Sequence, residues 1–135
     1  NMVPYTILDL GTGLPSPIRD AVNMCDDIVV LVEPTEHTIT HTKALLSNLA
    51  EMQVSKNEIK LVLNNRVRMD LSVPIPDIPK RLGHNFAGII NPAPELFYQA
   101  SLRRLPAILY QSDSLAAKQI MKLAETITIP IALPS

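Results

Sequence analysis

The residues best suited to chemistry lie near the start of the chain, in YTILDLGTGLP, residues 5–15. Asp9 ends an apolar run, and Gly11 and Gly13 follow it. A carboxylate at a strand end suits a hydrated magnesium ion, which keeps several waters and accepts few protein oxygens. Glycines allow the backbone to approach a phosphate closely. Because an aspartate before a glycine is also a common turn former, both a ligand role and a turn role stay open for Asp9.

A second candidate lies at the end of the apolar stretch KLVLN, where Asn64 is followed by Asn65 and Arg66. The Asn64 amide offers a donor and an acceptor, which complement an adenine edge. Arg66 could stack on the base or pair with another residue of the protein. The alternative for Asn64 is a residue that only turns the chain after a strand.

Four apolar runs, rich in β-branched residues, predict the strands that would position these side chains: Thr6 to Leu10, Ile28 to Val32, Ile59 to Leu63 and Ala87 to Ile90. They lack the polar alternation of a half-exposed strand, which is typical of parallel strands buried on both faces. The fold class is therefore α/β, a layered, mostly parallel sheet with flanking helices. Ligands of such sheets bind outside the carboxyl ends of the strands, where Asp9, Glu33, Asn64 and Asn91 follow the four runs.

Helical periodicity separates these runs, and the residues at the expected boundaries suit helix ends. Ser16 is expected to cap the first helix, with Pro17 at its first position, and Thr35 precedes a longer helix. Gly83 can end the short helix in PDIPKRLG. A last amphipathic helix is expected from about Ser114 to Thr126.

Composition favours one domain over residues 1–135, since 47% of the residues are hydrophobic. The net charge of −1 gives no strong nucleic-acid or membrane signal. The single cysteine, Cys25, and the lack of a signal peptide or of a long apolar span agree with a cytoplasmic protein. Asn1 before Met2 suggests an expression scar, and hence a piece excised from a longer protein.

Other chemical sites have weaker support in the sequence. His37 and His41 are one helical turn apart, but no third ligand at convincing spacing completes a zinc site. A Ser/His/Asp hydrolase would need a nucleophile elbow of the G-x-S-x-G kind, which is not found. We predict no catalytic residue in this chain.

Five segments, in this order along the chain, resemble the C-terminal half of a MinD/ParA-type P-loop ATPase, most of all its CpaE-like branch: ILDLGTGLP, DDIVVLVEPTEHTITHTKALLSNLAEM, IKLVLNNRV, LGHNFAGIINPAPELFYQA and LPAILYQSDSLAAKQIMKLAETI. The likeness covers nearly the whole chain and implies a partial P-loop NTPase fold. It implies that Asp9 is the Walker B carboxylate that holds Mg²⁺ through water, and that the turn of Gly11 and Gly13 senses the γ-phosphate. It assigns Asn64 to the adenine and Arg66 to the surroundings of the base.

The same resemblance places Pro92 beside the adenine, in the loop NPAPE. The family commonly has an aspartate two residues after that proline, where this chain has Pro94, and Glu95 is the nearest substitute. The family's phosphate-binding loop, glycine-rich with a lysine before Ser/Thr, has no counterpart in these 135 residues. We therefore expect ATP and Mg²⁺ to be cofactors of the intact protein, neither held tightly by this chain, and no ATP hydrolysis by the chain alone.

The resemblance also implies a nucleotide-dependent switch that positions or assembles cellular machinery, such as pili, the division site or a partition system. Strands that are lacking upstream would leave a sheet edge open, so we expect self-association, most simply a homodimer. The intact protein would be cytoplasmic, with a peripheral membrane location as a further option.

Two alternatives come from other functional classes. A non-catalytic interaction domain could keep the ATPase fold and bind a partner protein. A receiver module would also place an aspartate at the end of a strand like ILDLG, but VVLVEP and LVLNN stand where its Thr/Ser and Lys-Pro strand ends belong.

Overall fold

The structure, a computed structural model, describes residues 5–66 and 73–127 and contains a parallel sheet of three strands. The strands are β1 (Ile28–Val32), β2 (Ile59–Asn64) and β3 (Phe86–Ile90), and β2 lies between the other two. The predicted α/β class and three of the four predicted strands are thereby confirmed.

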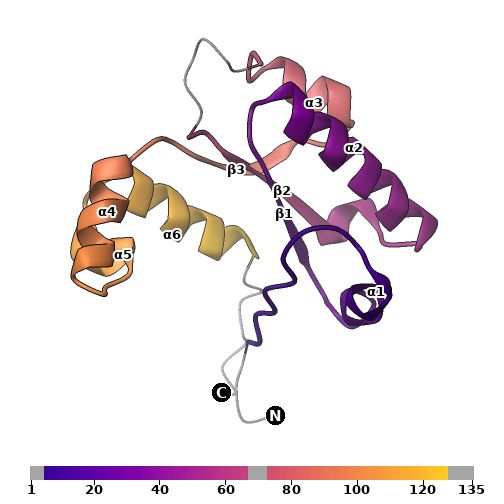
Figure 1. The fold of residues 1–135 in the computed structure, drawn as a ribbon, viewed down its shortest axis with the longest axis horizontal. Helices are drawn as coiled ribbons and strands as arrows, with labels where there is room; N and C mark the ends of the chain where they lie inside the picture. The colour runs from indigo at the N-terminus through magenta and orange to yellow at the C-terminus, as the bar shows by residue number, and fades with distance from the viewer. Residues whose placement is uncertain (1–4, 67–72, 128–135) are drawn as a thin grey trace, which may run out of the picture.

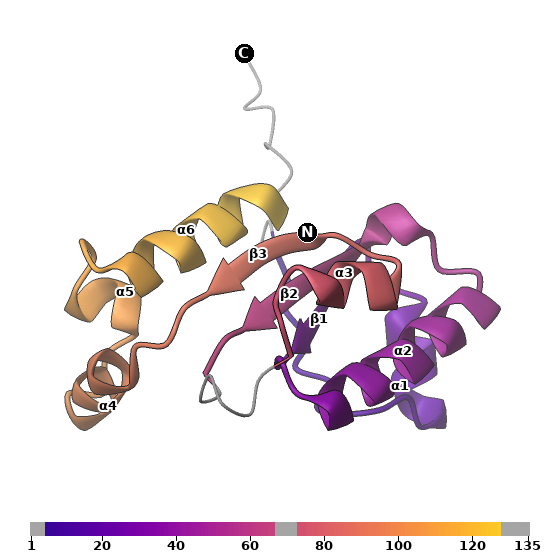
Figure 2. The same ribbon diagram turned by 90° about the horizontal axis from the view of Figure 1, so that it is seen from above.

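Helices alternate with the strands and gather in two groups. Figure 1 shows α1, α2 and α3 to one side of the sheet and α4, α5 and α6 to the other, and the view from above in Figure 2 separates the same two groups. Their bounds are α1 (Ser16–Val22), α2 (Glu36–Glu51), the short 3-10 helix η1 (Lys56–Glu58), α3 (Asp77–Leu82), α4 (Pro94–Leu102), α5 (Ala107–Tyr110) and α6 (Leu115–Ile127). None of the helices within the described residues is both long and apolar enough to cross a bilayer.

The main core lies between the sheet and helices α1 to α3. Val30 pairs with Leu61 across β1 and β2, and Val32 pairs with Leu63, so these four side chains share one face of the sheet. They are buried together with apolar residues of the helices: Val22, Ile39, Leu46, Leu49, Ile78 and Leu82. This layer fixes the strand tips relative to the first turn of α2.

The opposite face of the sheet is covered unevenly. Helix α6 packs against β3, where a Cβ added to Gly88 would lie 3.1 Å from Leu123 Cδ1. Gly88 therefore permits a close approach of helix and strand. On β1 the same face stays open: Val29 is 44% exposed and Leu31 is 61% exposed.

The predicted first strand does not form, and this expectation was wrong. Residues 5–10 have no regular structure, and Ile7 is 92% exposed. A strand is held by backbone hydrogen bonds to a neighbour, and none of the described strands pairs with this segment. The run from Thr6 to Leu10 thus has the composition of a strand, but none of the described strands pairs with it.

The predicted helix ends are confirmed with one exception. The Thr35 hydroxyl accepts a hydrogen bond from the Thr38 N–H at 3.2 Å, and Gly83 ends α3 with φ +67°. Ser114 Oγ accepts from the Ala117 N–H at 3.2 Å, in front of α6. The cap expected of Ser16 is not made, because Ser16 is already the first residue of α1 and Pro15 takes the capping position.

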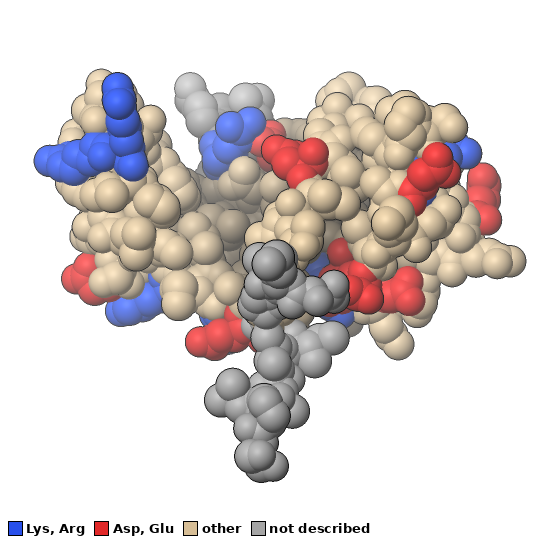
Figure 3. Space-filling view, turned by 90° about the horizontal axis from the view of Figure 1, so that it is seen from below, with Lys and Arg blue, Asp and Glu red and all other residues tan. Residues whose placement is uncertain are grey.

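Charged side chains are mixed in sign over the face seen from below (Figure 3). Basic residues gather at the left end of this view and most acidic residues lie toward the right, with wide uncharged areas between them. The presence of both signs agrees with the net charge of −1.

Candidate functional site

The carboxyl ends of the three strands bring polar residues to one edge of the sheet. Asn64 is the last residue of β2, is half-buried, and lies opposite Ile90 of β3. The next residue continues the pairing, since the Asn65 N–H donates to the Ile90 carbonyl at 2.9 Å. The tip of β2 is therefore held by backbone bonds, which leaves the Asn64 side chain as the polar group that this tip presents.

Glu33 and Arg66 connect the tips of β1 and β2. Arg66 Nε donates a hydrogen bond to Glu33 Oε1, and the two groups form an ion pair. Of the two roles left open for Arg66, the structure shows the pairing. The sequence places Glu33 at a strand end, and no local pattern in it indicates which cation Glu33 contacts.

A second carboxylate at the same end of the sheet also has a fixed partner. Arg81 of α3 donates from both Nη1 and Nη2 to the carboxylate of Glu36 in the first turn of α2, at 2.8 and 2.6 Å. This paired hydrogen bond from Arg81 lowers the pKa of Glu36. The contact ties α3 to α2, next to Thr35 and the tip of β1.

The loop after β3 is held by a residue that the sequence did not single out. The Asn91 N–H donates to Gln119 Oε1 of α6 at 2.9 Å. Pro92 follows and is exposed, as a residue that packs beside a bound ligand can be. Gln119 interrupts an otherwise apolar helix face, and that interruption is the one signal that could have revealed it.

Asp9 forms the turn that its sequence allowed. Its Oδ1 accepts a hydrogen bond from the Gly11 N–H at 3.2 Å. Gly11 and Gly13 have φ of +68° and +79°, a region that favours glycine. The turn role of Asp9 is thus visible, while its metal role stays a prediction.

The structure joins Glu33 to Arg66 beside Asn64, but it does not join Asp9 to them. Among residues 5–66 and 73–127, no hydrogen bond or ion pair links Asp9 with Asn64 or Arg66. Figure 1 shows the segment before α1, in the darkest indigo, reaching α1 from below the sheet. The structure therefore shows a direct contact within the Glu33 and Arg66 pair, and the grouping of Asp9 with Asn64 around one nucleotide stays a prediction.

The donor set agrees with only part of a magnesium-nucleotide site. The described residues contain no cluster of three or more His, Cys, Asp or Glu side chains around a common point. A single exposed carboxylate such as Asp9 fits a cation that keeps most of its water, and the Asn64 amide fits a base edge. The ring centroids of His37 and His41 are 4.3 Å apart, so the two rings contact one another on α2.

Comparison with known proteins finds likeness in structure and not in sequence. No protein-family description and no curated protein matches the chain. Among solved structures, the MinD cell division protein of Aquifex aeolicus is similar to 88% of this chain, with a TM-score of 0.71 and 22% identity. The ParA family ATPase of Chlorobium tepidum is similar over 88% of this chain, with a TM-score of 0.74 and 14% identity.

A third similar structure is the septum site-determining protein MinD of Pyrococcus horikoshii, complexed with Mg-ADP, with a TM-score of 0.73 and 20% identity over 87% of this chain. The chain covers 52%, 48% and 47% of the Aquifex, Chlorobium and Pyrococcus chains, so it spans about half of their length. The chain has the fold of part of a MinD/ParA P-loop ATPase, which confirms the fold that the sequence resemblance implied.

Proposed function

We propose that residues 1–135 are the C-terminal part of a MinD/ParA-type nucleotide switch, of the CpaE-like branch, that helps to position or assemble cellular machinery. One observation supports this most strongly: the chain superposes on about half of several MinD and ParA structures, and Asn64 ends β2 in it. The pilus, the septum site and a partition system are the settings that the sequence resemblance implies.

In this proposal each predicted residue binds or positions one part of a magnesium nucleotide. Asp9 would hold Mg²⁺ through water, and Gly11 and Gly13 would form the turn next to the phosphates. Asn64 would bind the adenine edge, with Pro92 beside the ring and Arg66 keeping the two strand tips together through Glu33. The P. horikoshii MinD complexed with Mg-ADP supports this choice of cofactors. Bound Mg²⁺ would supply charge neutralisation at the phosphates.

The first test measures binding of a fluorescent ATP analogue to a version extended upstream by the sequence preceding Met2 in its gene. A nucleotide switch needs a glycine-rich loop with a lysine in that extension. The Asn64→Ala variant should lower the preference for ATP over GTP about tenfold, since one buried polar contact to the base is worth roughly 1 to 2 kcal/mol. Asn57→Ala, in the exposed helix η1, is the matched control. If the extended protein binds no nucleotide, the result would support the alternative of a non-catalytic interaction domain.

The second test concerns the 135-residue chain itself. We predict no magnesium-dependent ATP hydrolysis, because the sequence has no phosphate-binding loop with its lysine. Phosphate release would be followed with and without Mg²⁺. Turnover that requires Mg²⁺ and survives repeated purification would overturn this part of the proposal.

We also propose that the chain self-associates through the β1 side of the sheet. β1 pairs with β2 alone among the described strands, and the exposed Val29 and Leu31 lie on its open face. An unpaired edge with apolar side chains is a template for another chain. The MinC:MinD complex of Aquifex aeolicus supports protein partners for this fold in general.

Light scattering over a concentration series tests this association. The molecular mass should exceed that of one chain, and Leu31→Lys should lower it because a charge would be buried at the contact. Leu109→Lys is the control, since Leu109 is 69% exposed and belongs to α5, which Figure 1 shows away from β1 in the group of α4 and α6. A strict monomer at high concentration contradicts the proposal.

A further inference from the structure

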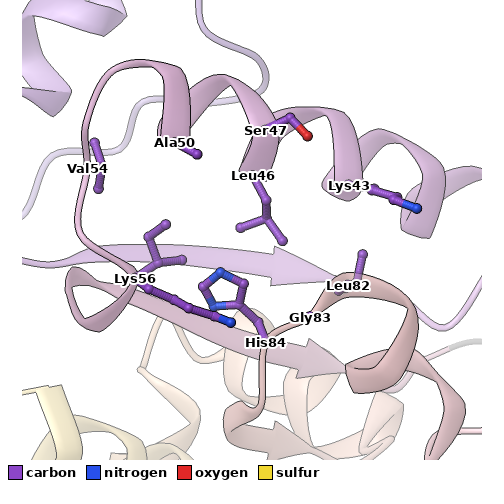
Figure 4. Close-up of a pocket in the computed structure, with 10 residues that line it drawn as sticks. Lys43, Leu46, Ser47, Ala50, Val54, Lys56, Leu82, Gly83 and His84 are labelled. Atoms are coloured by element: carbon purple, nitrogen blue, oxygen red, sulfur yellow. The ribbon is translucent and has the colours of Figure 1, made fainter.

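An open surface pocket of about 370 Å³, called the cavity below, lies at the opposite end of the sheet from the candidate nucleotide residues. It is bounded by α2, by the segment 54–59 that leads into β2, and by the connection from α3 to β3 (Figure 4). Ile59 and His84 lie at or just before the first residues of β2 and β3, so the cavity is at the amino ends of the strands. The nucleotide proposal uses none of its residues.

The lining of the cavity combines an apolar floor with a few polar groups. The apolar residues are Leu46, Ala50, Val54, Ile59 and Leu82. Polar and charged groups stand around them: Lys43, Ser47, Lys56 and His84. Small-molecule sites have this composition, mostly apolar with a small number of polar groups. This pocket is open to solvent on the side of the exposed Lys43, Ser47 and Ala50.

The charge in this cavity is positive. Figure 4 shows the Lys56 side chain extending along the cavity to the His84 ring, and Leu46 pointing down between α2 and these groups. Desolvation, and then the charge of Lys56, lower the pKa of His84, so its ring is neutral at pH 7 and carries one N–H donor.

Among the described residues, Lys43 and Lys56 have no carboxylate in an ion pair, unlike three other basic residues of the sheet and helices. Lys60 pairs with Asp27, Lys80 with Asp77 and Arg81 with Glu36. Within residues 5–66 and 73–127, no acidic side chain forms an ion pair with Lys43 or Lys56. The cavity therefore offers cations without a counter-ion, above an apolar floor.

We propose that this cavity binds a small aliphatic carboxylate, with its hydrocarbon chain on Leu46, Ala50 and Val54 and its carboxylate between Lys56 and His84. The lysine ammonium and the imidazole N–H are both donors, and a carboxylate accepts from both. The hydrocarbon chain replaces water on the apolar floor, which strengthens binding at most about fourfold per buried methylene. An aliphatic cation would meet Lys43 and Lys56 with the wrong sign.

Titration of the 135-residue chain with four probes tests the proposal: hexanoate, acetate, hexanol and hexylammonium. The readouts are the NMR signals of the His84 ring and of the Ala50 and Lys56 amides. Hexanoate should give saturable shifts of all three, and each of the other probes should bind at least fivefold more weakly. Equal binding of hexanol and hexanoate would overturn the carboxylate assignment, and no saturable shift with hexanoate would overturn the site.

Two substitutions locate the binding. Lys56→Gln should weaken hexanoate at least fivefold and leave hexanol unchanged, whereas Lys118→Gln, an exposed lysine of α6, should change neither. Ala50→Phe places a ring over the floor from an exposed position of α2 and should abolish the shifts of the His84 ring. Unchanged hexanoate binding in both Lys56→Gln and Ala50→Phe contradicts the proposal. Amide spectra of each variant confirm that it remains folded.

Discussion

Arg66, just past the end of β2, donates a hydrogen bond from Nε to the carboxylate of Glu33, just past the end of β1. The pair spans 33 residues of sequence and connects two strand tips at the edge where the predicted adenine residue Asn64 lies. The side chain of Glu33 is 29% exposed and that of Arg66 is 70% exposed. Because this ion pair is largely exposed, it mainly positions the two strand tips and contributes little to the free energy of unfolding.

A double-mutant cycle should measure this link. Glu33→Gln and Arg66→Gln should each destabilise the chain slightly, with a coupling energy of up to about 1 kcal/mol that shrinks in 0.5 M salt. Urea unfolding followed by circular dichroism gives the four free energies. The cycle of Arg66→Gln with Glu125→Gln, on the exposed face of α6, should show no coupling. A coupling unaffected by salt would contradict an electrostatic link.

The apolar pattern of the sequence predicted most of the fold, because strands buried on both faces are continuous apolar runs. Ile28 to Val32 was predicted with the observed bounds, and β2 and β3 each differ from prediction by one residue. The run Thr6 to Leu10 has the same apolar composition and does not form a strand. Strand pairing depends on a neighbour, and local composition does not record whether that neighbour is present.

The turn after Asp9 was predictable because its backbone conformation favours a residue type. Gly11 and Gly13 have the positive φ that their turn required. The contacts of Glu33 with Arg66 and of Gln119 with Asn91 were not predictable, because each joins side chains or loops from distant elements. A single sequence shows which residues can donate or accept a hydrogen bond, but it does not show which of them pair in the fold.

The pair of Glu36 and Arg81 predicts how stability depends on acid. The lowered pKa of Glu36 in the folded chain means that its stabilising effect is present above the unfolded value, near 4.5, and is lost as the pH falls through the folded pKa. Arg81→Gln should therefore flatten the fall in unfolding midpoint below pH 4.5. Urea midpoints measured from pH 3 to pH 7 test this, and Lys122→Gln on α6 should leave the slope as it is. If the urea midpoint of Arg81→Gln falls with pH as steeply as that of the unchanged chain, the pair of Glu36 and Arg81 does not contribute to the pH dependence of stability.

The close approach of Gly88 and Leu123 predicts a steric cost at the β3 and α6 contact. Gly88→Val should destabilise the chain by about 1 to 3 kcal/mol, because the added methyl groups meet Leu123. The cost should shrink in a Leu123→Ala background, where the space is free. Chemical unfolding of the four proteins measures both values. The same cost in both backgrounds would mean that β-strand propensity, and not this contact, governs the position.

Lys56 and His84 predict a pH effect at the other end of the sheet. Because the folded pKa of His84 is lowered, the unfolded chain takes up a proton first, and stability declines as the pH falls below the ordinary value of 6.5. Desolvation is the larger cause and Lys56 the smaller, so Lys56→Gln should raise the His84 pKa only part of the way. NMR titration of the His84 ring measures this shift. Lys43→Gln, which removes a charge from the same cavity but not one that acts on His84, should leave the His84 pKa nearly unchanged. If Lys56→Gln and Lys43→Gln shift the His84 pKa equally, then the total positive charge of the cavity lowers this pKa, and the position of Lys56 beside the ring has no particular effect.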